Sequence, residues 1–236
     1  MDSLPPLAAW GLDGPSPEEL TGGSRNTVLR VGDVVLKTTR RSEAALRWLL
    51  PVQEAARRAG LLVPRLLEST SGTLSADGWT CEERLDGTAP VAVPASLRPM
   101  IKHAHDATYR IAQRPGFASV TDMPARGRHG DVDMDAIPAQ IANTLRRVWA
   151  DMVVERECAI HADIYPENLL IVPDGRLALI DWDEARRDRP VFDLAAFEEH
   201  RPAASVAWEV ACSWTLEPDY AQRMLARLFS SFPEYA

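Results

Sequence analysis

Short runs rich in β-branched residues, separated by glycine turns, dominate the beginning of the chain. The stretch LTGGSRNTVLRVGDVVLKTT predicts strands on either side of turns at Gly22-Gly23 and Gly32-Asp33. The stretches LLVPRLLEST and GWTCEERLDG predict further strands. We therefore expect this part of the chain to build a small β-rich unit.

Helical signals interrupt this β-rich part twice. The segment SPEEL at residues 16–20 has the order of a capping box, with a proline at the first helical position, and it predicts a helix start. A longer periodic pattern predicts a helix from Ser42 to about Ala59, ending at Gly60. Pro51 lies inside it and is expected to kink it or split it in two.

The pattern changes after residue 86. Apolar positions at helical spacing predict helices over residues 95–115 and 136–156, and residues 192–232 are again largely helical. The expected fold class is α+β, with a small β-rich N-terminal lobe over residues 1–86 and a mostly helical C-terminal lobe over residues 87–236. Ligand sites favour the interface between two such lobes.

One predicted hairpin places two polar side chains together. In NLLIVPDGRLALID, the dipeptide Asp174-Gly175 is a strong turn signal between two apolar runs. A two-residue turn there would pair Asn168 directly with Asp181, with their Cβ atoms about 4.5–5.5 Å apart. Adjacent hard oxygen ligands with room left over suit a Mg²⁺ ion that also carries substrate phosphates. Asp163 would lie in the loop that leads into this hairpin.

Composition limits the class of protein. The formal net charge is −8 and the hydrophobic content is 46%, so a sizeable core is expected and a broad nucleic-acid surface is not. No apolar run approaches the roughly 18 residues of a membrane span, and the N-terminus lacks the features of a signal peptide. Three scattered cysteines fit neither a metal site nor a disulfide framework. We expect a cytoplasmic protein.

Lysine is rare in this chain. Lys37 and Lys102 are the two lysines among 26 basic residues, and Lys37 lies on the third predicted strand. A compact ammonium group suits places where the planar fork of arginine does not fit. Lys37 is therefore a candidate for a specific role.

These residues carry a family resemblance. The order His161-x-Asp163-x₄-Asn168, then Ile180-Asp181-Trp182, then Asp193-Leu194-Ala195, resembles the aminoglycoside phosphotransferase and choline kinase group of the protein-kinase-like fold. The glycine-rich turn, Lys37 and the helix with Glu43 follow the same order. The likeness covers roughly residues 20–200, and the absence of a long activation segment favours a small-molecule kinase over a protein kinase.

The resemblance implies a role for each matching residue. Asp163 would orient or deprotonate the acceptor hydroxyl, Asn168 and Asp181 would hold Mg²⁺, and Asp183 would either add a metal contact or form a salt bridge to the ARRDR segment. Lys37 would contact the nucleotide phosphates and pair with a helix glutamate, with Glu43 favoured over Glu54. The remaining nucleotide contacts would come from the backbone at Gly22, Gly23, Ser24 and Asn26 over the phosphates, and from the strand end at Glu83 next to the purine.

For several other residues we expect a structural role or leave two roles open. We expect His161 to hydrogen-bond the catalytic loop and Asp193 to hold that loop by its backbone. The segment DVDMD lacks the glycine and glutamate of a calcium loop and is read as a solvated loop or helix cap. Trp208 and Trp214 would pack the C-terminal helices or line the acceptor site. Five acidic residues would receive an amine of the acceptor or lie on a helix surface: Glu198, Glu199, Glu209, Glu217 and Asp219.

The expected function is an ATP- or GTP-dependent, Mg²⁺-requiring phosphotransferase that acts on a hydroxyl group of an aminoglycoside-, amino-alcohol- or sugar-like molecule. Nucleic acid and membrane partners are not expected. The alternatives are a catalytically idle kinase-like module that binds nucleotide or a partner, and a metal-dependent hydrolase. The hydrolase reading gives no reason for Lys37 or the glycine-rich turn.

Overall fold

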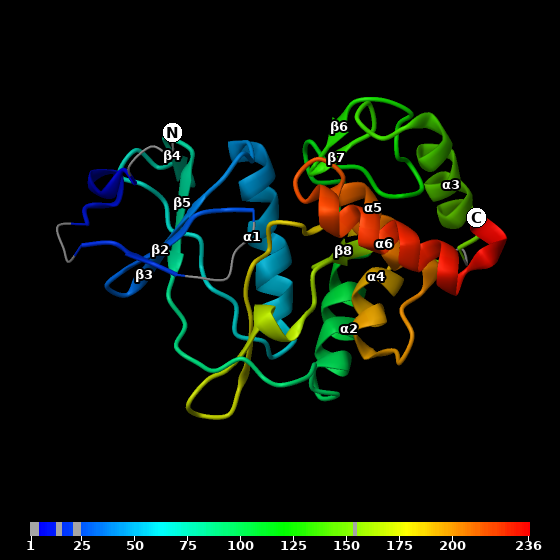
Figure 1. The fold of residues 1–236 in the computed structure, drawn as a ribbon. Helices are drawn as coiled ribbons and strands as arrows, with labels where there is room; N and C mark the ends of the chain where they lie inside the picture. The colour runs from blue at the N-terminus through cyan, green and yellow to red at the C-terminus, as the bar shows by residue number, and fades with distance from the viewer. Residues whose placement is uncertain (1–4, 13–15, 21–24, 153–154) are drawn as a thin grey trace.

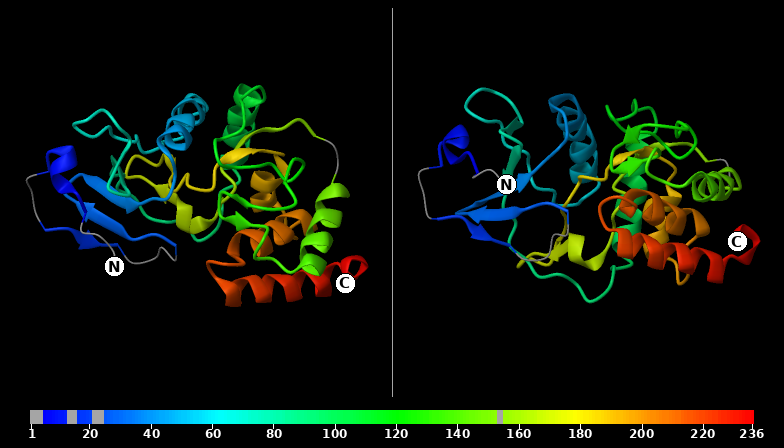
Figure 2. Two further views of the ribbon diagram at one scale, coloured as in Figure 1. Left: turned by 90° about the horizontal axis from the view of Figure 1, so that it is seen from above. Right: turned by 45° about the horizontal axis from the view of Figure 1, so that its top comes forward.

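A computed structural model of the chain describes residues 5–12, 16–20, 25–152 and 155–236. A β-sheet forms one end of the molecule, and α3, α5 and α6 form the other, with α1 and α2 between them (Figure 1). Turning the molecule keeps this order: α5 and α6 stay side by side at the end away from the sheet (Figure 2). The two-lobe α+β architecture expected from the sequence is therefore confirmed.

The N-terminal lobe is built on one antiparallel sheet with the strand order β1-β2-β3-β5-β4. The β2–β3 hairpin turns at Gly32, whose φ of 58° suits glycine. The register places Lys37 on β3 between Val28 on β2 and Thr80 on β5. The strands are β1 (Glu18–Glu19), β2 (Val28–Val31), β3 (Val34–Thr38), β4 (Ser75–Ala76) and β5 (Trp79–Glu83).

Two local predictions for this lobe are wrong. The expected capping-box helix is absent from the described residues 16–20, where Glu18–Glu19 pairs with β2 instead. The segment is polar and runs into Gly22-Gly23, so it offers no apolar face that would stabilise a helix. The expected strand in LLVPRLLEST is reduced to isolated bridges at Leu62 and Leu66, on either side of Pro64, which lacks an N–H donor.

Helix α1 (Glu43–Arg58) begins where the sequence predicts. The hydroxyl of Ser42 accepts a hydrogen bond from the backbone N–H of Ala45 at 3.2 Å. The expected split at Pro51 does not occur, because α1 is continuous from Glu43 to Arg58. Pro51 lies on the exposed face, while the opposite face of α1 packs into the core and stabilises the whole helix.

The C-terminal lobe contains the remaining helices, all shorter than their predicted ranges. Among the described residues, no helix is long and apolar enough to cross a membrane. Short strand pairs β6–β7, β8–β11 and β9–β10 lie between the helices. The helices are α2 (Leu97–Thr108), α3 (Ala139–Ala150), α4 (Val191–Leu194), α5 (Ala203–Ser213) and α6 (Pro218–Ser231). The strands are β6 (Arg128–His129), β7 (Val132–Asp133), β8 (Cys158–Ile160), β9 (Leu169–Ile171), β10 (Leu177–Leu179) and β11 (Arg186–Asp188).

A shared hydrophobic core connects the two lobes. One buried cluster combines Leu49 of α1 with Ile101 of α2 and Leu179 of β10, so the β9–β10 hairpin is packed against both lobes. A second cluster holds α3, α5 and α6 together around Leu145, Val210 and Leu228. Because interiors are close-packed, the hairpin is held in a fixed position relative to both parts of the chain.

The β9–β10 hairpin forms as predicted but with a different register. The predicted two-residue turn would pair Leu170 with Leu179. Leu170 instead pairs with Ala178, because the turn contains three residues, Pro173 to Gly175. Gly175 has a φ of 85°, the left-handed position of such a turn. Asn168 therefore faces Ile180, whose N–H donates to the carbonyl of Asn168 at 3.0 Å. Asp181 is the next residue, and its φ of 59° turns the chain there.

Candidate active site

A cavity of about 280 Å³ brings most of the predicted site residues together. Lys37 and Asn26 line it from the N-terminal lobe, and Asp163, Asn168 and Asp181 line it from the C-terminal lobe. These residues come from separate segments: the approach to β2, strand β3, the loop after β8, the start of the β9–β10 hairpin and its end. The fold thus places both sets of side chains around one space.

The loop that carries Asp163 is held by its backbone. Asp193 at α4 is almost fully buried and accepts hydrogen bonds from the N–H groups of His161 at 3.0 Å and Ala162 at 2.7 Å. His161 is also buried, and its Nε2 contacts the carbonyl of Ile180 at 2.9 Å. Burial lowers the pKa of His161, so the ring is neutral at pH 7. The structural readings of His161 and Asp193 are confirmed.

Asp163 and Asn168 are directly bonded. The amide nitrogen of Asn168 donates to the carboxylate of Asp163 at 2.7 Å and to its carbonyl at 2.9 Å. The amide oxygen is then the atom of Asn168 that remains to face a cation. Burial and the nearby charge of Asp181 raise the pKa of Asp163 to about 6. A carboxyl group with this pKa can accept a proton near neutral pH.

Lys37 forms an ion pair with Asp181 across the cavity. Burial alone would lower the pKa of Lys37, but the carboxylates of Asp181 and Asp183 raise it instead, so the ammonium stays charged. Asp181 keeps 39% of its side chain exposed and has a second oxygen that can bind an ion.

The donor set around Asn168 and Asp181 fits a hard divalent cation. The amide oxygen of Asn168 and the carboxylate of Asp181 are ligand types that Mg²⁺ prefers. Within the described part of the chain, no group of three or more His, Cys, Asp or Glu side chains is arranged to hold a metal ion. An ion bound here would therefore need further ligands from a substrate or from water, as Mg²⁺ in phosphoryl-transfer sites does.

The prediction that Glu43 or Glu54 pairs with Lys37 is wrong. The carboxylate of Glu43 accepts the N–H of Leu74 at 2.9 Å and pairs with Arg47 at 2.7 Å, because the first turn of α1 faces the loop before β4. Glu54 pairs with Arg58 at 3.2 Å. The sheet register instead places Glu82 on the same face as Lys37. Burial raises the pKa of Glu82 to about 7, against the lowering influence of Lys37.

Asp183 lines the cavity, but its salt-bridge partner differs from the predicted one. Its carboxylate pairs with Arg41 at 2.9 Å, not with the ARRDR segment, where Arg186 pairs with Asp188 at 2.9 Å. Arg186 is fully buried, with its guanidinium 3.4 Å from the centroid of the Trp208 ring. Although burial acts in the opposite direction, Lys37 and Arg41 lower the pKa of Asp183. A metal contact by Asp183 stays a prediction.

The other residues predicted to contact the nucleotide lie in different parts of the structure. Gly22, Gly23 and Ser24 lie outside the described residues, whereas Asn26 lines the cavity. Glu83 is not among the described residues that line it. Its N–H donates to the carbonyl of Arg65 at 3.0 Å, and its carboxylate accepts the N–H of Arg65 at 3.3 Å. A nucleotide contact at this strand end stays a prediction that rests on backbone groups other than the N–H of Glu83.

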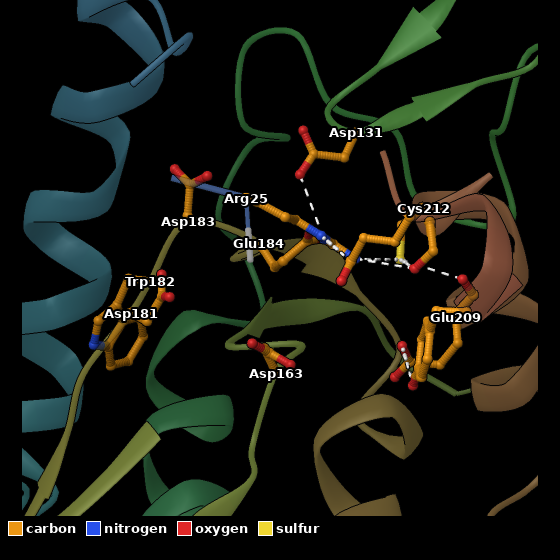
Figure 3. Close-up of polar contacts among 12 residues, drawn as sticks. Arg25, Asp131, Asp163, Asp181, Trp182, Asp183, Glu184, Glu209 and Cys212 are labelled. Carbon is orange, nitrogen blue, oxygen red and sulfur yellow. Dashed lines mark hydrogen bonds and ion pairs between the residues drawn. The ribbon is translucent and has the colours of Figure 1, made fainter. Parts of the chain in front are cut away.

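Sequence reasoning missed an arginine and two acidic residues at this cavity. Asp131, read from the sequence as part of a solvated loop, is buried and faces Arg25 and Arg41. Figure 3 shows the Arg25 side chain between Asp131, Glu184 and Cys212. Burial and the charge of Asp131 raise the pKa of Glu184 to about 8. These segments are far apart in the sequence, so no local pattern could have grouped them.

Two of the five acidic residues considered for an amine line the cavity. Glu217 pairs with Arg25 at 2.7 Å, and Glu209 accepts hydrogen bonds from Tyr165 at 2.8 Å and Tyr220 at 3.2 Å. The other three are exposed helix or loop residues: Glu198, Glu199 and Asp219. Eight of the described lining residues are acidic and two are basic, so acidic side chains predominate around the cavity.

The two tryptophans have different positions. Trp208 is buried, lines the cavity and packs against Trp149 with ring centroids 6.4 Å apart. The prediction that Trp208 packs the C-terminal helices is confirmed, and a contact with an acceptor stays a prediction. Trp214 is partly buried and packs against the helical core.

Comparisons with known proteins agree with this arrangement. A family model described as the phosphotransferase enzyme family matches residues 17–223. No curated protein sequence matches the chain. A choline/ethanolamine kinase family protein from Mesorhizobium loti has a TM-score of 0.54 at 22% identity, with 98% of this chain and 92% of that chain covered.

Two further solved structures share the fold. An aminoglycoside phosphotransferase from Alicyclobacillus acidocaldarius has a TM-score of 0.55 at 14% identity, with 100% of this chain and 94% of that chain covered. An amicoumacin kinase in complex with AMP-PNP, Ca²⁺ and Ami has a TM-score of 0.60 at 13% identity, with 97% of this chain and 75% of that chain covered. At these identities the likeness shows the protein-kinase-like fold.

Proposed function

The chain belongs to the phosphotransferase enzyme family, and on this premise we propose that it transfers the γ-phosphate of ATP or GTP to a hydroxyl group of a small, amine-bearing molecule. The observation that carries the proposal is the convergence of Lys37, Asp163, Asn168 and Asp181 on one cavity. Phosphoryl transfer requires mainly positioning and charge stabilisation, and these four residues supply groups for both.

Asp163 is the proposed catalytic residue. Its carboxylate is fixed by Asn168 at 2.7 Å, on a loop held by Asp193. A raised pKa of about 6 leaves it ionised at pH 7 and able to accept the proton of an acceptor hydroxyl. Its main contribution is to orient that hydroxyl towards the phosphorus atom.

Asn168 and Asp181 are the proposed ligands of Mg²⁺, with Asp183 as a further candidate. When bound, the ion neutralises the charge of the phosphate oxygens. Lys37 orients the phosphates through its ammonium group, which Asp181 holds at the cavity. We further propose that the backbone from Gly22 to Asn26 covers the phosphates and that the strand end near Glu83 lies beside the purine. We also propose that the boundary between the two lobes lies near residue 86.

The charge of the cavity supports an amine-bearing acceptor. Eight acidic and two basic side chains line it, and such a surplus of carboxylates attracts a cation and disfavours a neutral sugar. The structural neighbours named for choline, ethanolamine and aminoglycosides are consistent with this class.

Thermal unfolding with MgATP and MgGTP tests the nucleotide site. A ligand at about 100 times its Kd stabilises the native state by about 2.7 kcal/mol, so a Mg²⁺-dependent rise in Tm is expected. Asp181→Ala should abolish this rise. Asp174→Ala provides a matched control, because Asp174 lies in the turn of the same hairpin and pairs only with the neighbouring Arg176 in the described structure.

Turnover with amino alcohols and aminoglycosides then tests the reaction itself. A Tm rise without any phosphorylated product would favour a catalytically idle module. Phosphate release without an acceptor product would favour a hydrolase. The absence of a Mg²⁺-dependent rise with either nucleotide would contradict the proposed function.

A further inference from the structure

The side chain of Arg25 crosses the cavity from the N-terminal lobe to the C-terminal lobe. Its Nε donates to Glu217 at 2.7 Å, and one terminal nitrogen donates to Glu184 at 2.5 Å. The other terminal nitrogen donates to the hydroxyl of Ser213 at 3.1 Å. All three guanidinium nitrogens are therefore bound by residues that are about 160 or more positions away in the chain.

The groups around this guanidinium form a receptor for a cation. Asp131 lies 3.6 Å from the same nitrogen that Glu184 binds, and we refer to Asp131, Glu184 and Glu217 as the acidic cluster. Glu184 is only 9% exposed, and its second carboxyl oxygen accepts no hydrogen bond from an N–H donor of the described residues. Burial and the neighbouring Asp131 carboxyl group raise the pKa of Glu184. A bound cation favours the ionised form of Glu184, whose second oxygen can then accept a further N–H donor.

The acidic cluster and the reacting groups share one cavity. Arg25, the acidic cluster, Asp163 and Asp181 all line it, and Figure 3 shows Asp163 below the Arg25 guanidinium, between Asp181 and Glu209. An acceptor whose hydroxyl reaches Asp163 would therefore have its amine close to the acidic cluster. In the described structure the Arg25 guanidinium already occupies that cluster.

The neighbouring Arg41 provides a comparison. Its ion pairs are enclosed by other side chains, and we call such an arrangement a permanent clamp. Arg41 also binds Asp131, at 3.0 Å, and Asp183 at 2.9 Å. Its side chain is 8% exposed and stacks over Phe117, and it is not among the described residues that line the cavity. Arg25 is 20% exposed and lines the cavity. Arg25 therefore has open space beside its side chain, whereas Arg41 is enclosed.

We propose that Arg25 is an internal competitor that occupies the acceptor's ammonium site, so that an amine-bearing acceptor binds the acidic cluster by displacing it. This inference rests on the proposed function. Because the competitor is part of the chain, the apparent Kd of an amine-bearing acceptor equals its intrinsic Kd divided by the fraction of molecules in which Arg25 has left the acidic cluster. It also favours acceptors with several amines or a well-placed amine over neutral alcohols, which cannot replace the guanidinium.

Binding of ethylammonium chloride tests the proposal without requiring the natural acceptor. If Arg25 occupies the cluster in about nine molecules of ten, Arg25→Ala should bind ethylammonium about tenfold more tightly than the unchanged protein. Potassium chloride at equal ionic strength corrects for screening. Arg30→Ala is the matched control, since Arg30 is a half-exposed arginine on strand β2 that pairs with Glu18, and it should leave the affinity unchanged.

A measurement on the unchanged sequence covers the case in which Arg25→Ala does not fold. With arginine labelled by ¹⁵N at Nε, the Arg25 signal is identified by its loss in Arg25→Lys. Ethylammonium should shift this signal towards the position of exposed arginines, because displacement breaks the bond from Nε to Glu217. A permanent clamp would leave the signal in place while the amine binds elsewhere or not at all.

Each outcome decides the proposal. Unchanged or weaker ethylammonium binding in Arg25→Ala, an unmoved Arg25 signal, or no binding to either protein would overturn it. The proposed function is judged separately by the Mg²⁺-dependent Tm rise with nucleotide. A nucleotide response without displacement of Arg25 would reject the competitor alone, and displacement without a nucleotide response would reject the kinase function alone.

Discussion

Two non-glycine residues at the candidate site have left-handed backbone conformations. Ala162 has a φ of 71° immediately before Asp163, and Asp181 has a φ of 59°. Such conformations cost of order 1 kcal/mol or more for residues with a Cβ atom, and they persist only where neighbouring contacts require them. At Ala162 the contact is the hydrogen bond from its N–H to Asp193 at 2.7 Å. The strain therefore coincides with the residues that aim Asp163 and Asp181 into the cavity.

Asp163→Asn should stabilise the protein while it removes activity. The pKa of Asp163 is about 6 in the folded protein, whereas the ordinary value for an aspartate is 3.8. Ionisation of Asp163 therefore costs folding free energy. This cost is absent below pH 4, grows as the pH rises from about 4 to 6, and is complete above pH 6. Without nucleotide or Mg²⁺, the variant should exceed the unchanged protein by about 3 kcal/mol in the free energy of unfolding at pH 7.5, the energy that corresponds to this rise in pKa.

Urea unfolding at pH 4 and pH 7.5 measures this difference. Phosphotransfer should fall by about 10²–10⁴-fold, the usual contribution of a positioned acid or base. Asp174→Asn is the control, because hydrogen bonds from Arg176 lower the pKa of that exposed carboxylate and reverse the sign of the pH trend. A variant that is less stable at pH 7.5, or equally shifted at both pH values, would contradict the assignment.

At the scale of elements, the β9–β10 hairpin is positioned by the segment that connects the lobes. Thr88 exchanges backbone hydrogen bonds with Ile171 at 3.1 Å and 2.8 Å. A Cβ atom on Gly87 would lie 2.9 Å from the carbonyl oxygen of Ile171 and 2.9 Å from the Cβ of Leu170. Gly87 therefore allows the connecting segment to approach the hairpin that carries Asn168 and Asp181.

Gly87→Ala and Gly175→Ala form a matched pair on this hairpin. Gly175 has a φ of 85° and open space around its missing side chain, so the alanine variant should lose about 1 kcal/mol from backbone strain and keep its response to MgATP. Gly87→Ala must displace the β9 backbone, so its MgATP-dependent Tm rise should shrink. Equal nucleotide responses in the two variants would show that the connecting segment does not position the metal ligands.

At the scale of the whole molecule, the buried side chain of Arg114 connects the two lobes. Arg114 is 1% exposed and donates from Nε to the carbonyl of Ala45 in α1 at 3.1 Å. One of its terminal nitrogens donates to the carbonyls of Asp183 at 2.7 Å and Ala185 at 2.9 Å. Burial lowers its pKa to about 10, so it stays charged at pH 7. This side chain connects α1 to the segment after Asp181, across the interface between the lobes.

Arg114→Met should therefore destabilise the protein and weaken nucleotide binding together. It keeps apolar volume but leaves several buried carbonyl oxygens without a donor, which should cost about 3 kcal/mol or more in the free energy of unfolding. Urea unfolding and the MgATP-dependent Tm rise measure the two effects. Arg110→Met, at an exposed arginine nearby, should change stability by no more than about 0.5 kcal/mol. A similar small loss at Arg114 would contradict its role as a connector.

Local patterns were sufficient for most of the elements and for the short-range part of the site. The Asp163, Asn168 and Asp181 spacing predicted a shared site because a hairpin brings residues on either side of its turn together. Ser42 predicted the start of α1 correctly because an N-cap acts within one turn. The family resemblance, read from the order of these motifs, is confirmed by the family model over residues 17–223.

Contacts between distant segments were decided by the tertiary structure. The turn length changed the pairing of Asn168 from Asp181 to Ile180, a difference of one residue that side-chain alternation cannot reveal when both strands are apolar. Lys37 paired with Asp181 instead of Glu43, and Arg25 reached Glu184 and Glu217 across the cavity. The sequence by itself determined the α+β lobes and the kinase-like motifs, because hydrophobic period and turn chemistry act locally. Only packing decided which charges neutralise one another, since a buried charge takes whichever partner the assembled fold places beside it.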